Sequence, residues 1–434
     1  MTQNLQSKLV EKKYLLTFIL ITSLFALWGF ANDITNPMVA AFQTVMELSA
    51  AKASLVQFAF YGGYATMAIP AALFAKRYSY KKGILLGLIL YAIGAFMFIP
   101  AANRQEFGFF CVSLYILTFG LAFLETTANP YILSLGSKET STRRLNLAQA
   151  FNPIGSLLGM FVASRIVLAK LESDTAQVRE IGFSNLDDAT KLSIREHDLD
   201  IIRNPYVVLG CVVILVFIII AIFVKDNNNT ADNNSAADNK GTMKRLFTNK
   251  IYREGVLTQF FYVAAQIMTW TFIIQYADRL GIDKATAQIY NIIAMGMFLC
   301  GRFISTFLMR YVNSRKLLMY FAIGAMAAAA GTILIDGIAG LYCLMAISIF
   351  MSLMFPTIYG IALENVSLND SNLGAAFLVM AIVGGSLMPP IQGMIIDLGT
   401  VAGLPAVNFS FILPFICFLM IFIYGLRASR SINS

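Results

Sequence analysis

The chain has 434 residues, of which 58% are hydrophobic and only 13% carry a charge. Soluble domains run at about 45–50% apolar and about 25% charged residues, so this composition excludes a cytosolic enzyme, a secreted disulfide scaffold, a disordered hub and a nucleic-acid-binding protein. The net charge of +8 does not point to nucleic acid in such a chain, because Lys and Arg accumulate on the cytoplasmic side of membrane proteins.

Apolar runs long enough to cross a membrane recur along the whole chain. A spanning helix needs about 20 mostly apolar residues. The sequence predicts twelve spans, at about 14–41, 53–75, 83–102, 106–135, 145–168, 204–225, 254–277, 287–311, 317–337, 339–364, 374–397 and 406–427. The first run follows basic residues, as in a signal peptide, but it is too long and lacks a small-residue cleavage site. We therefore predict an all-α membrane protein with an uncleaved first helix.

The charges between the spans predict the orientation of the chain. If the N-terminus is cytoplasmic, the short cytoplasmic segments are rich in Lys and Arg, whereas the short outer loops hold only Lys52, Arg104, Arg279 and Lys284. This bias follows the positive-inside rule. The longer segment 169–203 has nearly balanced charges and is predicted to be an outer loop. Both termini are then cytoplasmic.

Weak internal repeats and a polar linker indicate two related halves. The segment 227–239 is rich in Asn, Asp and Ala, which is typical of a flexible linker. Lys76–Lys82 resembles Arg310–Lys316, and Pro153–Leu157 resembles Val383–Leu387, both at offsets of about 230 residues. Parallel repeats of this kind bind a substrate near the membrane midplane. We predict an N-terminal six-helix half at 1–225, a cytoplasmic linker at 226–253 and a C-terminal six-helix half at 254–434.

Charged side chains inside the spans are the first candidates for function, because a charge at the bilayer centre costs about 2.5–3.5 kcal/mol on insertion scales. The deepest are Asp33, Glu125 and Arg302. Four acids near the ends of spans are assigned structural roles: Asp278, Asp336, Glu364 and Asp397.

Glu125 is the strongest of these candidates. It lies four residues before Asn129, so the two side chains share a helix face, and Pro130 loosens the backbone just beyond them. A carboxyl at this depth is costly to ionise, so it can be neutral and then ionise when water enters. That property suits a proton carrier; the alternative is a structural Glu that stays protonated or paired.

Polar stripes on the first and fifth spans extend the candidate site. The first span carries Trp28, Asn32, Asp33 and Asn36. The fifth span carries three amides spaced by three residues: Asn146, Gln149 and Asn152. Such a stripe faces either an aqueous cavity or another helix, where interhelical hydrogen bonds are the alternative role.

The second half offers amides, an arginine and aromatic rings on shared helix faces. The candidates are Gln259, Tyr262, Gln266, Trp270, Asn291, Arg302, Phe355 and Tyr359. Amides and carboxyls opposite aromatic rings suit a monosaccharide, because its hydroxyls need paired donors and acceptors while the apolar face of a pyranose packs on a ring. For any single aromatic residue, plain packing is the alternative.

At these residues the chain resembles the fucose permease family, the fucose:proton symporters of the major facilitator superfamily. The resemblance runs through nearly the whole chain. It is carried by Leu27–Asn32, Leu124–Thr126 with Ala128–Pro130, Arg144–Gln149 with Phe151-Asn152, Gln259-Phe260 with Tyr262-Val263, Gly301–Phe303 and Phe355–Ile358. The strings around Glu125 and Gln149 are the specific ones, and the others support them.

The resemblance implies uptake of a monosaccharide with a proton by alternating access, across the inner (cytoplasmic) membrane of a bacterium. It implies that Glu125 contacts the substrate and takes up a proton, that Gln149 and Asn152 line the sugar site, and that Arg302 belongs to the cavity of the second half. Glu125 stands where glucose/galactose-type relatives carry Gln, which favours L-fucose. A broader hexose carrier is the alternative.

One position departs from the family pattern. Asn36 stands where the family usually carries an Asp that is taken to be central to proton coupling, and the acid here is Asp33, one helical turn away. Either Asp33 has taken over the titrating role, or coupling differs, with Glu125 alone carrying the proton or with sodium as the coupling ion. We favour a proton symporter.

Other functional classes are not expected. The single histidine, His197, lies in a charged segment, and the five cysteines fall within apolar runs without a CxxC pair, which predicts buried thiols with neither disulfides nor a metal site. The sequence also lacks the GxxxxGK[ST] motif of a nucleotide-driven pump. We therefore expect no enzyme activity, cofactor, metal or nucleic-acid partner. The partners are a sugar, a coupling ion and the bilayer, and a monomer suffices because each chain holds both halves.

Overall fold

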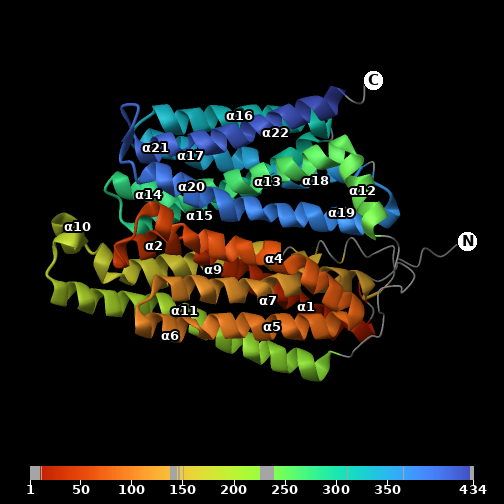
Figure 1. Ribbon diagram of the computed structural model, residues 1–434, viewed down its shortest axis with the longest axis horizontal. Helices are drawn as coiled ribbons and strands as arrows, with labels where there is room; N and C mark the ends of the chain where they lie inside the picture. Colours follow the sequence, from red (N-terminus) through yellow and green to blue (C-terminus); the bar gives the residue numbers. More distant parts are fainter. Residues whose placement is uncertain are drawn as a thin grey trace, which may run out of the picture. The chain divides into compact units, whose positions relative to one another are not determined.

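The computed structural model describes residues 10, 12–136, 144, 147–149, 151–224, 239–309, 311–364 and 366–430. Within these residues, twelve helical stretches are long and apolar enough to cross a membrane (Figure 1). The prediction of a twelve-span, all-α membrane protein is confirmed. A two-stranded antiparallel hairpin that the sequence did not predict, β1 (Thr400–Val401) with β2 (Leu404–Pro405), precedes the last span.

Several spans of the N-terminal half consist of two helices separated by a short break. The spans are α1 (Leu15–Thr35) with α2 (Met38–Val45), α3 (Ala50–Ala53) with α4 (Leu55–Arg77), α5 (Tyr80–Phe96) with α6 (Phe98–Arg104), α7 (Phe107–Ser134), α9 (Phe151–Val162) and α11 (Asp188–Phe223). The first break falls at Asn36-Pro37, because a proline disfavours the helical conformation of the residue before it.

The C-terminal half is built in the same way and follows α12 (Asn239–Thr248). Its spans are α13 (Lys250–Thr271) with α14 (Ile273–Arg279), α15 (Lys284–Leu308), α16 (Ser314–Leu334), α17 (Ile338–Met351) with α18 (Met354–Leu363), α19 (Leu368–Met380) with α20 (Gly384–Ile396), and α21 (Ala406–Ser410) with α22 (Ile412–Arg430). In Figure 1, α16 lies beside α22 along most of its length, and the two helices pack together.

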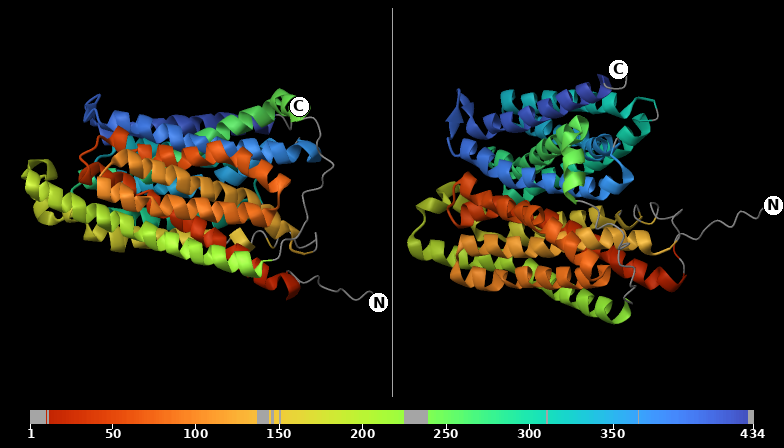
Figure 2. Two further views of the ribbon diagram at one scale, coloured as in Figure 1. Left: turned by 60° about the horizontal axis from the view of Figure 1, so that its bottom comes forward. Right: turned by 45° about the vertical axis from the view of Figure 1, so that its right-hand side comes forward.

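The sixth span begins earlier than the sequence predicted. Residues 188–203, predicted as part of a loop, continue α11 as one helix of 36 residues (Figure 2). Tertiary hydrogen bonds stabilise this polar extension. The fully buried Asp198 carboxylate accepts bonds from the backbone N–H groups of Glu172 and Ser173, at 2.8 and 3.0 Å. Hydrophobic patterning detects the membrane-crossing part of such a helix and not its polar end.

The sequence also predicted that the cysteines are buried, and this is only partly correct. All five are free thiols, but only Cys417 is buried, while Cys211 and Cys300 are exposed on their helices. An apolar run in a spanning helix has a face that the protein does not cover, so an apolar neighbourhood in the sequence does not establish burial inside the protein.

The chain forms two compact units whose boundaries cross the sequence halves. The first contains Met1–Thr35, Thr66–Ala163 and Leu199–Ser235, and the second contains Asn36–Ala65, Ser164–Asp198 and Ala236–Ser434. Because successive spans alternate in direction, the ends of α2 and α14 lie on the side of the membrane opposite the termini, here called the distal side. The second unit therefore joins the C-terminal half to distal segments of the N-terminal half.

In each half, a glycine lets two helices of that half pack closely against each other. In the first unit, a Cβ atom on Gly155 of α9 would lie 1.9 Å from the carbonyl oxygen of Ala26 on α1. In the second unit, a Cβ atom on Gly384 of α20 would lie 2.1 Å from the carbonyl oxygen of Phe260 on α13. Small residues at such crossings let two spanning backbones approach. Both glycines lie in the segments that the sequence comparison paired as a repeat.

Candidate functional site

The predicted residues of the first unit lie on α1, α7, α9 and the short helical segment at 147–149. The contact between α1 and α9 fixes part of this group. A Cβ atom on Gly29 would lie 2.2 Å from the backbone oxygen of Asn152, so only glycine allows this approach. The side-chain Nδ2 of Asn152 donates to the backbone oxygen of Phe25 at 3.3 Å. Asn152 thus makes the interhelical bond that was the alternative to a sugar contact, and this bond does not use its amide oxygen.

Glu125 lies in the second half of the membrane-crossing helix α7 and is half-buried. Among the described residues, its carboxylate has no hydrogen-bond or ion-pair partner. Asn129, one turn later, donates from Nδ2 to the backbone oxygen of Glu125 at 3.0 Å. Gln149 donates from Nε2 to Oδ1 of Asn129 at 3.3 Å, and the side chain of Gln149 is exposed. The predicted group Glu125, Asn129 and Gln149 is therefore brought together, with a carboxylate that can still bind a ligand.

The three predicted residues of α1 differ in exposure. Trp28 and Asn32 are half-buried, whereas Asp33 is only 2% exposed. Trp28 packs against Phe25 with a distance of 6.0 Å between ring centroids. The helix ends two residues after Asp33, at Thr35. Asp33 is thus a buried acid close to a break in the first span. Asn146 of the polar stripe lies outside the described residues.

Asn36 belongs to the second unit and lies beyond the end of α1. Asp33 and Asn36 are three residues apart in the sequence, and α1 ends between them, at Thr35. The Oδ1 atom of Asn36, a residue only 2% exposed, accepts a bond from Nε2 of Gln57 at 3.1 Å. The same Nε2 atom donates to Oγ1 of Thr271 at 3.1 Å.

Sequence reasoning missed Gln57, the residue at the centre of this network. It is fully buried, and its Oε1 atom has no hydrogen-bond partner among the described residues. An unsatisfied buried acceptor costs free energy unless a ligand or water meets it. The available signal was the amide itself, because Gln57 lies inside an otherwise apolar part of the second span.

Tyr262 and Trp270 of α13 use their polar atoms to bind α17. The hydroxyl of Tyr262 donates to the backbone oxygen of Met351 at 3.2 Å, and Nε1 of Trp270 donates to Oγ of Ser348 at 3.1 Å. Both side chains are buried. This arrangement matches the packing alternative, whereas Gln266, between them on α13, is half-buried.

The aromatic rings among the predicted residues of the second unit form two groups. Phe355 and Tyr359 stack with a centroid distance of 6.4 Å, and the edge of Tyr262 meets Phe355 at 5.9 Å. In the other group, Phe298 joins Trp270 to Arg302, with the Trp270 and Phe298 centroids 5.2 Å apart and the guanidinium carbon 4.9 Å from the Phe298 ring. An aromatic ring below a guanidinium stabilises the cation. Phe298 was not predicted as a site residue.

Arg302 and Asn291 carry the polar chemistry of this second group. Nε of Arg302 donates to the backbone oxygen of Ser352 at 3.3 Å, and the exposed guanidinium borders a cavity of about 420 Å³. Asn291 donates from Nδ2 to the backbone oxygen of Trp270 at 3.3 Å. Its buried Oδ1 atom has no hydrogen-bond partner among the described residues. Helix α15 thus carries both a cation and an unused acceptor.

The acids near span ends make structural contacts. The nearest atoms of Asp336 and Arg279 lie 2.8 Å apart, and Glu364 forms an ion pair with Arg315. The hydrogen bond from Arg279 is the main reason that the pKa of Asp336 lies below its usual value. Asp397 accepts bonds from the backbone N–H groups of Ala50 and Ala51 at 2.6 and 2.9 Å, and so caps the start of α3.

Comparisons with known proteins identify the family of the chain. Residues 16–389 match the model of the Major Facilitator Superfamily. The chain is 63% identical to the L-fucose-proton symporter of Haemophilus influenzae over 425 residues, covering 98% of this chain and 99% of that protein. It is 30% identical to the glucose/galactose transporter of Brucella abortus, covering 97% and 96% of the two chains.

A solved structure agrees with these sequence matches. The crystal structure of a variant of the E. coli fucose:proton symporter, FucP, matches with a TM-score of 0.69 at 32% identity, covering 96% of this chain and 99% of that chain. The family model covers most of this chain, and both named relatives align along nearly their whole length. The chain therefore belongs to the major facilitator superfamily.

Proposed function

We propose that this protein imports L-fucose across the bacterial inner membrane together with a proton, by alternating access. The observation that carries the proposal is the half-buried Glu125, inside a membrane span, whose carboxylate has no partner among the described residues. The bonded amides of Asn129 and Gln149 lie beside it. The 63% identity to a protein named as an L-fucose-proton symporter supports the choice of sugar and ion.

The proposed cycle follows from the cost of a charge inside the membrane. A proton from outside neutralises the carboxylate of Glu125, which lowers the cost of occluding it together with a neutral sugar. After the protein opens to the cytoplasm, water enters, the sugar leaves and the carboxyl releases its proton. The amide oxygen of Asn152 and the exposed amide of Gln149 supply hydrogen bonds to sugar hydroxyls. Arg302 and the stacked pair Phe355 and Tyr359 contribute from the C-terminal half.

The topology of the proposed transporter follows the charge pattern. Both termini and the linker 226–253 are cytoplasmic, and the distal side faces outward. The linker joins an N-terminal half at 1–225 to a C-terminal half at 254–434. One chain contains the complete pair of halves, so we propose that a monomer in the bilayer transports sugar.

The distal contact between α20 and the start of the second span is proposed to be part of the outer gate. Asp397 caps α3, and Oγ of Ser386 donates to the backbone oxygen of Phe58 at 2.8 Å. A Cβ atom on Gly393 would lie 2.6–2.7 Å from the backbone of Ala50 and Ala51. These segments belong to different sequence halves, and in alternating access such halves move against each other. Opening the distal side would break these contacts.

The primary test is uptake of labelled L-fucose into proteoliposomes that contain the purified protein, under an inward proton gradient, an inward sodium gradient or no gradient. Accumulation driven by protons alone is the expected result. Accumulation driven by sodium would overturn proton coupling. Absence of L-fucose uptake together with uptake of galactose or glucose would instead support the broader hexose carrier.

A second measurement assigns the role of Asp33. If Asp33 is the titrating acid that replaces the acid of the family, Asp33→Asn abolishes proton-driven accumulation, and Asn36→Asp in the same chain restores part of it. The Nε2 atom that Gln57 now directs at Asn36 can donate equally to a carboxylate. Full accumulation by Asp33→Asn would assign coupling to Glu125 alone.

A further inference from the structure

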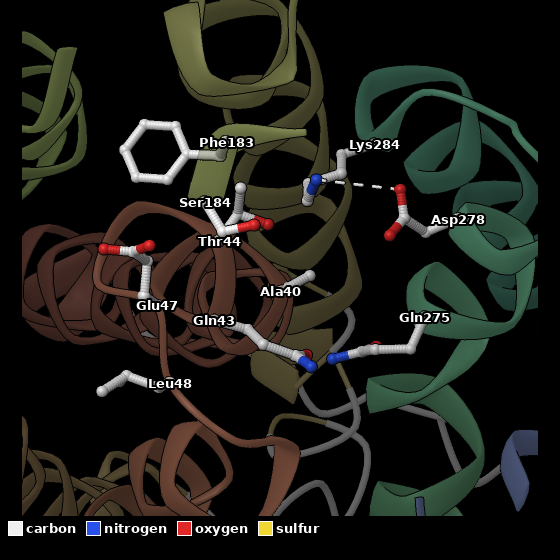
Figure 3. Close-up of a pocket in the computed structure, with 10 residues that line it drawn as sticks. All are labelled: Ala40, Gln43, Thr44, Glu47, Leu48, Phe183, Ser184, Gln275, Asp278 and Lys284. Atoms are coloured by element: carbon white, nitrogen blue, oxygen red, sulfur yellow. Dashed lines mark ion pairs between the residues drawn. The ribbon is translucent and has the colours of Figure 1, made fainter. Parts of the chain in front are cut away.

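A polar pocket on the distal side lies outside the group of predicted site residues. Its volume is about 330 Å³, and α2, η6 (Phe183–Asn185), α14 and the start of α15 enclose it (Figure 3). All of its lining residues belong to the second unit. Ligand pockets for small molecules begin at about 300 Å³, so the pocket has room for one monosaccharide.

Two glutamine amides supply the hydrogen-bonding capacity of the pocket. The side chains of Gln43 and Gln275 point toward each other from α2 and α14 (Figure 3). Gln275 is only 8% exposed, and neither its Nε2 nor its Oε1 atom has a hydrogen-bond partner among the described residues. A buried amide without a partner is unfavourable unless a ligand or water satisfies it. Gln275 therefore holds one unused donor group and one unused acceptor in the wall of the pocket.

The charged residues around the pocket are already paired with other protein groups. Glu47 binds Lys191 at 3.2 Å and Arg195 at 3.0 Å. On the opposite wall, Lys284 binds Asp174 at 2.8 Å.

The other acid of that wall is paired in the same way, because Asp278 lies 3.2 Å from Arg179. The capacity that remains is neutral: two amides, the hydroxyl of Thr44 and the apolar surfaces of Leu48 and Phe183. Amides and an aromatic ring in the lining of one pocket favour a neutral polyhydroxylated ligand over an ion.

We propose that this pocket is a second, vestibular binding site for a monosaccharide, which is occupied when the distal side is closed. This inference rests on the proposed function for the identity of the sugar. The pocket exists because α2, from the first sequence half, lies close to α14, from the second, and opening the distal side would separate them. A ligand that binds one arrangement more tightly shifts the equilibrium toward it. Sugar in the vestibule therefore holds the distal side closed and slows its reopening.

The kinetic consequence is inhibition of uptake by excess external sugar. Initial rates of L-fucose uptake into proteoliposomes would be measured from the half-saturating concentration to about a hundred times that value, as an order-of-magnitude range for a weak second site. We expect the wild-type rate to fall by at least twofold at the upper end. Gln275→Leu and Gln43→Leu should saturate without a fall and keep their half-saturating concentration within twofold. A decline equal to that of the wild type in both variants, or no decline in the wild type, overturns the inhibitory site.

A control variant and a binding stoichiometry make the result independent of transport. Gln177→Leu replaces an exposed amide on α10 (Ala176–Ile181) outside this pocket and should behave like the wild type. Gln275→Leu removes no hydrogen bond that the structure contains, so it should not impair folding. Equilibrium dialysis with labelled L-fucose should give two sugars per wild-type chain and one per Gln275→Leu chain.

The stoichiometry also separates the two proposals. If the proposed function fails but the vestibular site exists, the wild type binds one sugar, Gln275→Leu binds none, and no uptake occurs. If the vestibular site does not exist, wild type and Gln275→Leu bind equal amounts, and this result overturns the inference whether or not uptake occurs.

Discussion

The carboxylate of Glu125 and the acids on the distal side differ in whether other protein groups pair with them. On the distal side, Glu47 pairs with Lys191 and Arg195, and Asp397 caps α3. Inside α7, the carboxylate of Glu125 has no such partner among the described residues. Pairing marks charges whose contribution is structural, whereas an unpaired carboxylate in the membrane implies a ligand or a proton. The type of residue is the same in both places, and its surroundings distinguish the roles.

The largest expected effect on transport comes from a change to the unpaired carboxylate of Glu125. Glu125→Gln keeps the shape of the side chain and removes its ability to release a proton, so proton-driven accumulation of L-fucose should fall to equilibration across the membrane. Exchange of internal for external sugar should persist, because it needs no net movement of protons. Both are measured in proteoliposomes.

The matched control for Glu125→Gln is Glu364→Gln, which removes an acid that pairs with Arg315. This variant should still accumulate sugar. Full concentrative uptake by Glu125→Gln would show that the unpaired carboxylate is not the proton carrier, and loss of accumulation in both variants would remove the distinction between paired and unpaired acids.

The next effect concerns packing rather than charge. Gly155→Ala adds a methyl group only 1.9 Å from the carbonyl oxygen of Ala26, which is too close for two non-bonded atoms. Overpacking of this kind costs about 1–3 kcal/mol, so the variant should unfold at a lower temperature in detergent. The control is Gly296→Ala, since a Cβ atom there would have no neighbour within 4 Å. Equal melting temperatures of the two variants would argue against the close crossing of α1 and α9.

A smaller effect is expected at the distal gate. Asp397→Ala removes the acceptor of two backbone bonds, and an exposed charge-assisted bond contributes about 1.5 kcal/mol, which is roughly tenfold in an equilibrium. Ser386→Cys provides a thiol at the contact between α20 and α4. It should react about tenfold faster with an impermeant reagent on intact cells when Asp397→Ala is also present.

The control for this measurement is Asp336→Ala, which removes a distal acid that does not contact α3. It should leave the labelling rate of Ser386→Cys unchanged, and a chain with Ser386 intact corrects for the native thiols. An unchanged rate in Asp397→Ala would mean that the cap does not hold the distal side closed.

Much of the fold was predictable from the sequence because membrane spans can be identified by their length and hydropathy. Glu125 was predictable for the same reason, since an acid inside an apolar run is conspicuous. The break at Asn36-Pro37 could have been anticipated from Pro37, yet its consequence could not. Only the structure shows that Asn36 accepts a hydrogen bond from Gln57.

The rest of the candidate site depends on contacts between segments far apart in the chain. Whether Trp270 stacks on a sugar or bonds to Ser348 depends on where α17 lies. The spacing of residues along α13 does not predict the position of α17. The polar start of α11 escaped prediction because Asp198 stabilises it through the backbone of Glu172 and Ser173. Spacing along one helix predicts which residues share a face, and it does not predict which partner that face meets.

The smallest expected effect is on the melting temperature, and it comes from Asp336, an exposed acid that is paired with Arg279. The hydrogen bond from Arg279 holds the pKa of Asp336 below its usual value, although the Asp336 side chain is 65% exposed. A carboxyl whose pKa is lower in the folded state stabilises the fold above its unfolded pKa of about 3.9, and this contribution disappears as the pH falls through the folded pKa. Exposed pairs contribute about 0.2–1 kcal/mol. Wild type should therefore melt slightly above Asp336→Asn at pH 7, and the two curves should converge at lower pH; a difference that grows on acidification would contradict the ion pair.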